Sequence, residues 1–373
     1  MKKITIVTMQ LKTPGGIERF VSTLAKIFSK DFHVEIIVNY GKPTDKLAFP
    51  LPANVKLTFL SPHQPKEVSM RQIITKFKWH KIPPELQRRH KIRTEQNKVF
   101  NNYLKTLDTN YIITDRAIYN SLISKYYTGH AQKIATDHNF HQNDHKYINE
   151  LINSLKGFDS LVVATKELKD FYQNKIKPTK CHLIPNPLAD IPSHKSDLSN
   201  KNILSVGRLV PEKDYPTLIK IMEKIHQKDP SIHLTIIGDG PEKQSIKQLI
   251  ESKKLDLCIT MTGSLSSKEI ASYYYNSSLF VMTSITEAFG LVLTEAMSYG
   301  VPCIALDRAS GARAQLSNNV GFLVSNPENM SNEIVNLLND KTRLKKCQEN
   351  LPSALKQYLP DNVLKDWTKT LKK

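Results

Sequence analysis

Residues 202–240 read NILSVGRLVPEKDYPTLIKIMEKIHQKDPSIHLTIIGDG, and this stretch determines the fold expected for the chain. The short apolar runs 202–206 and 233–237 predict two strands, and the apolar spacing in 215–226 predicts a helix between them. Parallel strands need a long crossover connection, so a strand, a helix and a strand at this interval predict a parallel βαβ unit. The second strand ends in Gly238-Asp239-Gly240-Pro241, which is a turn sequence.

The same alternation of short strands and helices runs through most of the chain. After this unit, residues 258–261 and 279–283 predict strands that alternate with helices at 246–252 and 268–275. Before it, the runs that predict strands are 4–9, 34–38, 55–60, 111–114, 133–136 and 160–164. Helical spacing occurs at 17–28, in a basic segment that Pro83-Pro84 breaks, and over 332–373. Two such series predict an α/β chain with two doubly wound, Rossmann-like domains and a cleft between them.

A polar stretch with proline and serine, residues 189–200, separates the two series and predicts an interdomain linker. We therefore expect a first domain over 1–188 and a second over 201–350. The chain of 373 residues has four cysteines without C-x-x-C spacing, which favours a reducing cytosol over a structural zinc site. No run approaches the roughly 20 apolar residues of a membrane span, and the N-terminus predicts a first strand rather than a signal peptide.

The net charge of +18 is concentrated in the first half of the chain. Residues 1–190 hold 30 Lys and Arg against 16 Asp and Glu, and residues 66–105 hold 11 against 3. Phe77 and Trp79 lie among the basic residues of this segment. A basic helix with aromatic residues indicates docking on an anionic membrane surface or an anionic polymer. The alternatives are an ordinary solvated helix and nucleic acid, for which no RNA- or DNA-binding motif is present.

Two glutamates eight positions apart, Glu287 and Glu295, bracket the turn Phe289-Gly290-Leu291. Glycine lets backbone N–H groups approach an oxyanion closely, and the N-terminus of a helix predicted over 292–297 favours a phosphate or a sugar hydroxyl. With Glu295 placed about two turns into that helix, a ligand lying across the N-terminus would meet both carboxylates. The alternative is a buried strand, a turn and a helix with solvated glutamates.

A second loop, 207–214, places Arg208 and Lys213 after the predicted strand 202–206. A guanidinium fork together with a mobile ammonium suits a diphosphate whose negative charge grows as it leaves. The alternative is two surface cations beside the acidic residues of the same loop.

Two loops of the first half also carry polar groups. Gly15-Gly16 precede a predicted helix and form an anion-facing loop, although the dinucleotide pattern G-x-G-x-x-G is absent. Residues 137–145 contain three histidines and two aspartates, which resembles a metal site. His138 directly follows a strand, however, and a single cleft histidine commonly bonds sugar hydroxyls or shuttles protons. We therefore expect no metal here.

Together these loops resemble the retaining glycosyltransferases of family four, which have the GT-B fold. The motifs that carry the resemblance are Gly15-Gly16, His138, Gly207-Arg208 with Glu212-Lys213-Asp214, Gly238-Asp239-Gly240-Pro241 and Glu287-x7-Glu295. The resemblance runs from the first strand to about residue 324, and it is more specific in the second half than in the first. It also implies that residues 351–373 form a helix that crosses back and packs on the first domain.

The resemblance implies a role for each matching position. The residues expected to act at the diphosphate and the reacting sugar are His138, Arg208, Lys213 and Glu287. The residues expected to bind the rest of the donor are Gly16, Gly238, Leu265, Phe289, Gly290, Leu291 and Glu295. Among them, Arg208 and Lys213 would hold the diphosphate, and Glu295 the ribose. His138 would meet the transferred sugar, Gly16 would let its loop close over the donor, and Leu265 would lie beside the base.

Two positions depart from the family's pattern. Ala288 stands where glycine or proline is usual, and Ala314 stands where an acidic residue is common after the glycine at Gly311. Neither departure touches the two cations expected at the diphosphate, but both affect the expected surroundings of the donor sugar.

The resemblance implies a metal-independent hexosyltransferase in the cytoplasm, peripheral on the inner face of the cell membrane. It would move a hexose from a nucleotide diphosphate sugar, with UDP as the expected nucleotide, and retain its anomeric configuration. The acceptor would be a cell-surface polysaccharide, a teichoic acid or a lipid-linked sugar, and residues 66–105 would dock on the anionic membrane. No cofactor and no nucleic acid partner are expected. The alternatives are a UDP-sugar epimerase of the same fold, a polyanion-binding protein without enzymatic activity, and a non-catalytic partner of another transferase.

Overall fold

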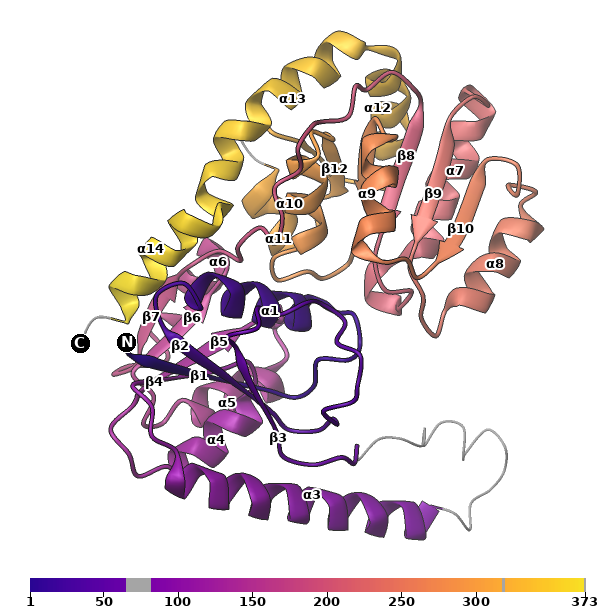
Figure 1. The fold of residues 1–373 in the computed structure, drawn as a ribbon. Helices are drawn as coiled ribbons and strands as arrows, with labels where there is room; N and C mark the ends of the chain where they lie inside the picture. Colours follow the sequence, from indigo (N-terminus) through magenta and orange to yellow (C-terminus); the bar gives the residue numbers. More distant parts are fainter. Residues whose placement is uncertain (65–81, 317–318, 372–373) are drawn as a thin grey trace. The chain divides into compact units, whose positions relative to one another are not determined.

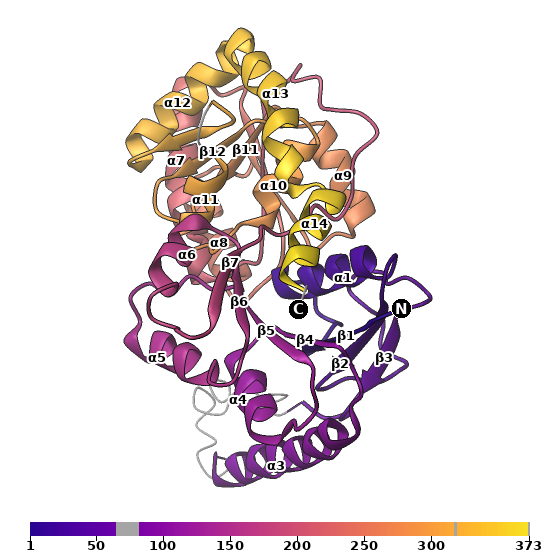
Figure 2. The ribbon, with the colours of Figure 1, turned by 90° about the vertical axis from the view of Figure 1, so that its left-hand side faces the viewer.

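The computed structural model describes residues 1–64, 82–316 and 319–371, which fold into two compact units (Figures 1 and 2). The first unit comprises Met1–Val163, Lys169–Leu183 and the residues from Leu364 onward. The second comprises Ala164–Leu168 and Ile184–Val363. Each unit therefore draws on more than one segment of the chain, and the division falls at 183/184 and 363/364 rather than at 188 and 351.

The first unit is built on a parallel sheet in the order β3-β2-β1-β4-β5-β6-β7. Its strands are β1 Lys3–Thr8, β2 His33–Val38, β3 Lys56–Phe59, β4 Tyr111–Thr114, β5 Gln132–Asp137, β6 Ser160–Val163 and β7 Lys180–Leu183. Its helices are α1 Gly16–Phe28, α3 Ile82–Thr106, α4 Ala117–Tyr126, α5 His145–Ser154, and the larger parts of α6 Lys166–Tyr172 and α14 Pro360–Thr370. Helix α1 lies on one face of the sheet, and α3, α4 and α5 lie on the other (Figure 1).

The second unit is built on a parallel sheet in the order β10-β9-β8-β11-β12-β13. Its strands are β8 Asn202–Val206, β9 His233–Ile237, β10 Ile259–Gly263, β11 Leu279–Met282, β12 Cys303–Leu306 and β13 Phe322–Val324. Its α-helices are α7 Tyr215–Lys228, α8 Lys243–Ser252, α9 Ser267–Tyr275, α10 Leu291–Ser298, α11 Ser310–Gln315, α12 Pro327–Asn339 and α13 Lys341–Leu355. Two 3₁₀ turns, η2 Pro211–Lys213 and η3 Lys356–Tyr358, complete it.

Alternating side chains divide the apolar core of the second unit into two layers. Ile203 of β8 packs with α7, α8 and α12 on one face of the sheet, whereas its neighbour Leu204 packs with α9, α10, α11 and α13 on the other. This follows from the strand geometry, because successive side chains point to opposite faces. Both faces are covered, which explains why the strands appear in the sequence as continuous apolar runs.

Each sheet has one place where the strand order reverses. In the first unit the reversal lies between β1 and β4, and in the second it lies between β8 and β11. The loops that follow the two strands diverge there, which leaves room for a ligand at the carboxyl ends of the strands. We call these places the first and the second switch point.

The structure confirms the predicted α/β class with two doubly wound units. Strands β4, β8 and β9 have the predicted bounds. Three strands were not predicted, namely β7, β12 and β13. Strand β7 has partly exposed residues, β13 has only three residues, and β12 continues the apolar stretch that begins in helix α10. Their local patterns therefore resembled a loop or an extension of a neighbouring element.

Residues 189–200, the predicted linker, are attached to the second unit. The N–H of Ser196 donates to the Tyr299 carbonyl at 2.8 Å, and the Gln348 side chain donates to the Ser196 carbonyl at 2.8 Å. The His194 ring stacks on Tyr275 with 3.8 Å between the ring centroids. Composition predicted an interdomain linker, and these contacts fix the segment to the second unit.

Helix α3 is held to the first sheet by a buried carboxylate. Tyr103 donates to Glu35 of β2 at 2.6 Å, and Lys56 of β3 approaches the same carboxylate at 3.0 Å. The described part of the helix starts at Ile82, has Pro83 and Pro84 among its first residues, and continues unbroken to Thr106. The rest of the predicted basic segment, residues 66–81, lies outside the described residues. No helix among the residues that are described is both long and apolar enough to cross a membrane.

The last helix, α14, completes the core of the first unit. Trp367 is fully buried, and its ring meets Phe28 of α1 edge to face with 5.6 Å between the centroids. The Gln132 side chain donates to the Thr370 carbonyl at 2.9 Å.

Candidate functional site

The candidate site begins with the turn that precedes helix α10. Gly290 caps the helix with φ of 82°, a left-handed conformation that glycine adopts without strain. Glu287 precedes this turn. Glu295 is the fifth residue of α10, so it lies about one turn into the helix rather than the two turns expected.

Residues of helix α11 donate hydrogen bonds to the carbonyl groups of this turn. The Gly311 N–H donates to the Glu287 carbonyl at 3.0 Å, and the Ser310 hydroxyl lies 3.5 Å from the Ala288 carbonyl. The Gln315 side chain donates to the carbonyls of Phe289 and Gly290. All four carbonyls from 287 to 290 thus face α11.

The N–H groups of the same turn face the opposite way. In a planar trans peptide the carbonyl of one residue and the N–H of the next are antiparallel. The N–H groups of Phe289, Gly290 and Leu291 therefore point away from α11, and none of them donates a hydrogen bond within the described residues. Three unpaired donors at a helix N-terminus form a site for an anion.

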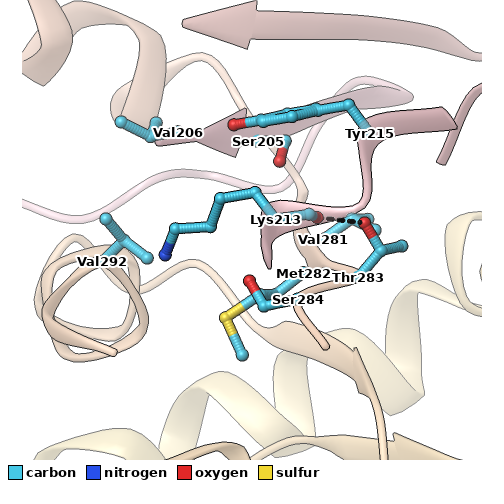
Figure 3. A pocket seen from close by; sticks show the side chains of 9 residues that line it. All are labelled: Ser205, Val206, Lys213, Tyr215, Val281, Met282, Thr283, Ser284 and Val292. Carbon is cyan, nitrogen blue, oxygen red and sulfur yellow. Dashed lines mark hydrogen bonds between the residues drawn. The ribbon is translucent and has the colours of Figure 1, made fainter. Parts of the chain in front are cut away.

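The loop after β8 brings a lysine to this turn. The Lys213 ammonium donates to the Glu287 carboxylate, although the two residues are 74 positions apart. Thr283, which follows β11, donates to the Lys213 carbonyl at 3.1 Å and holds the loop in place (Figure 3). The two sequence motifs therefore meet at the second switch point. Lys213 is not a surface cation bound to the acidic residues of its own loop.

A small pocket lies at the second switch point beside Lys213. Figure 3 shows the side chains that line it, with the Lys213 chain running past Val292 of α10. Its other walls come from the ends of β8 and β11 and from the residues that follow them: Ser205, Val206, Tyr215, Val281, Met282, Thr283 and Ser284.

Arg208 and the glycine loop of β9 complete this edge of the second sheet. Arg208 is exposed, and within the described residues it makes no ion pair. Gly238 has φ of 151°, and a Cβ there would lie 1.9 Å from the Gly207 carbonyl oxygen. Glycine at 238 therefore allows the two loops to pack against each other, which places the backbone beside Arg208.

The remaining donor-side positions lie in the same unit. Glu295 accepts a hydrogen bond from the Tyr274 hydroxyl at 3.3 Å, and Tyr274 stacks on Tyr299. Leu265 follows β10 and is partly buried against the core. The structure thus brings all of the predicted second-half residues to the carboxyl edge of one sheet.

His138 lies in the first unit, directly after β5. Its ring packs on Phe20 of α1 with 4.3 Å between the centroids, and its Nε2 lies 2.9 Å from the Thr136 hydroxyl. Burial, together with the charge of Arg116, lowers the pKa of His138 to about 3. The imidazole is therefore neutral at physiological pH and serves as a hydrogen-bonding group rather than a cation.

His141 and the two aspartates of 137–145 have separate structural contacts. His141 stacks on Phe171 with 3.9 Å between the centroids, and Asp144 caps helix α5. Asp137 accepts a hydrogen bond from Tyr147 at 2.5 Å. Across residues 1–64, 82–316 and 319–371, no group of three or more His, Cys, Asp or Glu side chains is arranged to hold a metal ion.

Gly16 opens helix α1 at the carboxyl edge of the first sheet. It is exposed, and a Cβ added to it would meet open space. Gly15 before it is extended, and Gln10 holds the first turn through a hydrogen bond to Glu18 at 2.6 Å.

Comparison with known proteins agrees with this architecture. The topology and the strand-end site define a GT-B-type α/β fold. A Staphylococcus aureus TarM mutant, solved with fondaparinux, α-GlcNAc-glycerol and UDP, superposes with a TM-score of 0.82 over all of both chains at 16% identity. At that identity the likeness shows the fold alone.

Sequence comparison concerns the chemistry more directly. Residues 189–353 match the family model "Glycosyl transferases group 1". An uncharacterized glycosyltransferase of Haemophilus influenzae is 29% identical over 56% of this chain and 60% of its own length. A Campylobacter jejuni N-acetylgalactosaminyltransferase, named for a diphospho-undecaprenol acceptor, is 26% identical over 94% and 93%. The chain spans only 28% of an exopolysaccharide phosphotransferase from Streptomyces coelicolor. These matches support the glycosyltransferase class.

Proposed function

We propose that this protein is a retaining, metal-independent hexosyltransferase that uses a UDP-sugar. Its acceptor is a hydroxyl of a lipid-linked or polymeric cell-surface molecule. The observation that carries this proposal is the convergence of donors at the second switch point. Arg208 and Lys213 belong to the loop after β8, three unpaired N–H groups belong to the turn before α10, and Glu287 of that turn already holds the Lys213 ammonium. Such a set complements a diphosphate.

The proposed step breaks the bond between the sugar C1 and the diphosphate oxygen. The acceptor oxygen bonds to C1 on the same face, and its proton passes to the departing diphosphate. Negative charge on that diphosphate grows as the bond breaks, so cations and N–H groups fixed beforehand lower the barrier. Glu287 holds Lys213 in place, and its carboxylate accepts hydrogen bonds from the hydroxyls of the donor sugar.

Relatives supply further support for the substrates. The Campylobacter jejuni relative is named for a saccharide acceptor linked to diphospho-undecaprenol, and the TarM structure was solved with UDP. A neutral His138 suits a residue that bonds the transferred sugar, because an imidazolium would oppose the positive charge developing at C1.

The test is turnover of UDP-, GDP- and dTDP-sugars by the full chain in the presence of EDTA. We expect one donor to be converted to its free nucleoside diphosphate at a rate that EDTA leaves unchanged. Proton NMR of the product should show the donor's anomeric configuration. Failure to bind any donor would contradict the proposal, and an epimer formed from donor alone would favour the epimerase.

We also propose that helix α3 docks the first unit on an anionic inner membrane surface. Its buried residues, Glu85, Ile92, Gln96, Phe100 and Leu104, face the unit. Exposed basic residues, including Lys91, Arg93 and Lys98, occupy the rest of the helix, with exposed apolar side chains at Leu86 and Val99. Basic and apolar groups together suit the boundary between lipid headgroups and chains.

Vesicle sedimentation tests the docking. We expect binding to vesicles that contain phosphatidylglycerol and none to pure phosphatidylcholine, with binding weakened by salt. Changing Lys91, Arg93 and Lys98 to glutamate should abolish it. The matched control reverses three exposed lysines of the second unit, Lys247, Lys268 and Lys345, and should bind as the unmodified chain does. Equal losses in both variants would show a general charge effect and no docking helix.

A further inference from the structure

The first switch point contains two charged side chains with spare hydrogen-bonding capacity. Asp115 follows β4 directly, and Arg116 caps helix α4 in an extended conformation. One carboxylate oxygen of Asp115 accepts from Thr8, the last residue of β1, at 2.6 Å. This bond joins the two strands between which the sheet order reverses. Neither residue is among those expected from the sequence to take part in the reaction.

One polar atom of each side chain has no hydrogen-bond partner in the described residues. Asp115 is 6% exposed, and its Oδ1 has no hydrogen-bond partner in the described residues. The Nε of Arg116 also lacks a hydrogen-bond partner there and lies 3.9 Å from Asp115 Oδ1. Buried polar atoms nearly always have a hydrogen-bond partner, so two neighbouring buried atoms without one require an explanation.

The distance between Arg116 Nε and Asp115 Oδ1 suits one bridging oxygen. At 3.9 Å the two atoms are too far apart for a direct hydrogen bond. A hydroxyl oxygen can accept from Nε–H and donate to Oδ1, and two bonds of about 2.8 Å that meet near a right angle span roughly 4 Å. A hydroxyl is both donor and acceptor, as this position demands.

The surroundings favour a neutral ligand over an anion. The charged groups that act on Asp115 are Arg116 and Glu18, so two carboxylates face one guanidinium. Tyr40 and Tyr119 also interact with the charge of Arg116, and both are buried. A phosphate would meet an excess of negative charge here, whereas sugar and polyol hydroxyls would find donors and acceptors interleaved.

The site also lies near the residue assigned to the transferred sugar. The charge of Arg116 contributes to the lowered pKa of His138 in the same unit. Burial raises the pKa of Asp115 to about 6 despite Thr8 and Arg116, so at neutral pH the group is mostly a carboxylate able to accept a hydroxyl proton.

We infer that Asp115 and Arg116 bind one hydroxyl of a neutral sugar or polyol unit of the acceptor. This inference rests on the proposed transferase function and adds the chemical class that the first unit recognises. The bridging oxygen is the hydroxyl of the acceptor that enters the first switch point.

Steady-state kinetics of Asp115→Asn provide the test. The probes are glycerol, myo-inositol and p-nitrophenyl hexosides as neutral acceptors, with glycerol phosphate as the anionic comparison. UDP release from the donor is the readout. We expect a neutral probe to accelerate release by the unmodified chain, and the variant to raise the KM for that probe at least tenfold. The amide retains an oxygen for Thr8 but presents a second donor to Arg116.

Two readouts separate this inference from the proposed function. UDP affinity and UDP release without acceptor should stay within twofold of the unmodified values in Asp115→Asn. The control Asp159→Asn changes a carboxylate that lies before β6, where it accepts the Lys133 N–H at 2.8 Å, and should leave acceptor KM unchanged. If no donor is bound or hydrolysed, the proposed function fails. If donor turnover persists but acceptor KM in Asp115→Asn stays within twofold, or no neutral probe accelerates release, this inference fails.

A crystal structure of the unmodified chain grown in glycerol provides a test independent of activity. A glycerol hydroxyl within hydrogen-bonding distance of both Arg116 Nε and Asp115 Oδ1, absent from Asp115→Asn crystals, supports the site. A direct hydrogen bond between the two side chains, with no room for an oxygen, overturns it.

Discussion

The two switch points share a topology but differ in the groups they leave unpaired. At the second, α11 accounts for every carbonyl of the turn, so the spare backbone groups are N–H donors; the cations Arg208 and Lys213 belong to the neighbouring loop, and Glu287 holds Lys213. At the first, the unpaired groups include one acceptor on Asp115 and one donor on Arg116. Strand order thus decides where a site lies, and the balance of spare donors and acceptors decides what it binds. Backbone N–H donors together with two cations suit a diphosphate, whereas one donor paired with one acceptor suits a hydroxyl.

The largest effect is expected from removing the carboxylate that holds Lys213. We expect Glu287→Gln to lower kcat for UDP release about 10³-fold, because the lysine loses its orientation and the sugar loses an acceptor. A double-mutant cycle with Lys213→Met measures the coupling, and the double variant should be little worse than either single one.

The matched control is Asp229→Asn, which breaks an ion pair of the same unit at 2.7 Å from Lys201. It should alter the free energy of unfolding while leaving kcat/KM for the donor within twofold. If Glu287→Gln retains near-normal turnover, the pair has no part in transfer.

Substitution of Arg208 tests whether this exposed guanidinium contributes as much to catalysis as Lys213, which Glu287 holds in place. We expect Arg208→Ala to lower kcat/KM for the donor about 10²-fold, and Arg208→Lys to recover part of the loss, since an ammonium keeps the charge without the planar fork. UDP titration calorimetry should show the weaker binding directly. Unchanged kcat/KM in Arg208→Ala would remove this residue from the site.

Gln315 contacts the candidate site only by donating hydrogen bonds to backbone carbonyls, so its substitution tests how much the fixed backbone of the turn contributes to turnover. We expect Gln315→Met to lower kcat about tenfold, since the Phe289 and Gly290 carbonyls lose their donor and the N–H groups lose their fixed direction. Donor KM should change less than kcat if the turn is needed chiefly as charge develops. A lower Tm with unchanged kcat would assign Gln315 to stability alone.

The smallest expected effect concerns Glu35 in the first unit. Burial raises the pKa of Glu35, but bonds from Tyr103, Thr58 and Lys56, with the charge of Lys3, outweigh it and lower the pKa to about 2. A carboxyl group with a lowered pKa stabilises the folded state above its unfolded value near 4.5, and this contribution is lost between there and pH 2. We expect a loss on the order of 2–3 kcal/mol over that range.

Denaturant unfolding from pH 5 to pH 2 measures this contribution. Glu35→Gln should be less stable than the unmodified chain at pH 5, and the difference should shrink towards pH 2. A constant difference across the range would show that the carboxylate charge contributes nothing.

The fold was predictable because buried parallel strands have a simple sequence signature. The runs at β4, β8 and β9 are short, apolar and separated by helical spacing, so the period alone identifies them. Strand β13 has three half-buried residues and no such signature, and its pairing with β12 decides its conformation. Local pattern therefore suffices only where the strand is buried on both faces.

The candidate site was predictable as a set of loops but not as a set of contacts. The rule that ligands bind at strand ends places Lys213 and Glu287 at one sheet edge, yet their pairing needed the strand order. Gln315 is the last residue of α11, a segment whose only notable sequence feature was the missing acidic residue at Ala314. Asp115 belongs to no motif, although its place directly after a buried strand was a usable signal.

The placement of Trp367 has a consequence for how the chain is made. This residue belongs to the core of the first unit, although it lies near the end of the described sequence. Because synthesis proceeds from the N-terminus, the second unit is complete before the segment that closes the first has left the ribosome. The earlier-made unit must therefore wait with Phe28 of α1 not yet covered by Trp367, and the later-made unit has every residue it needs to fold first.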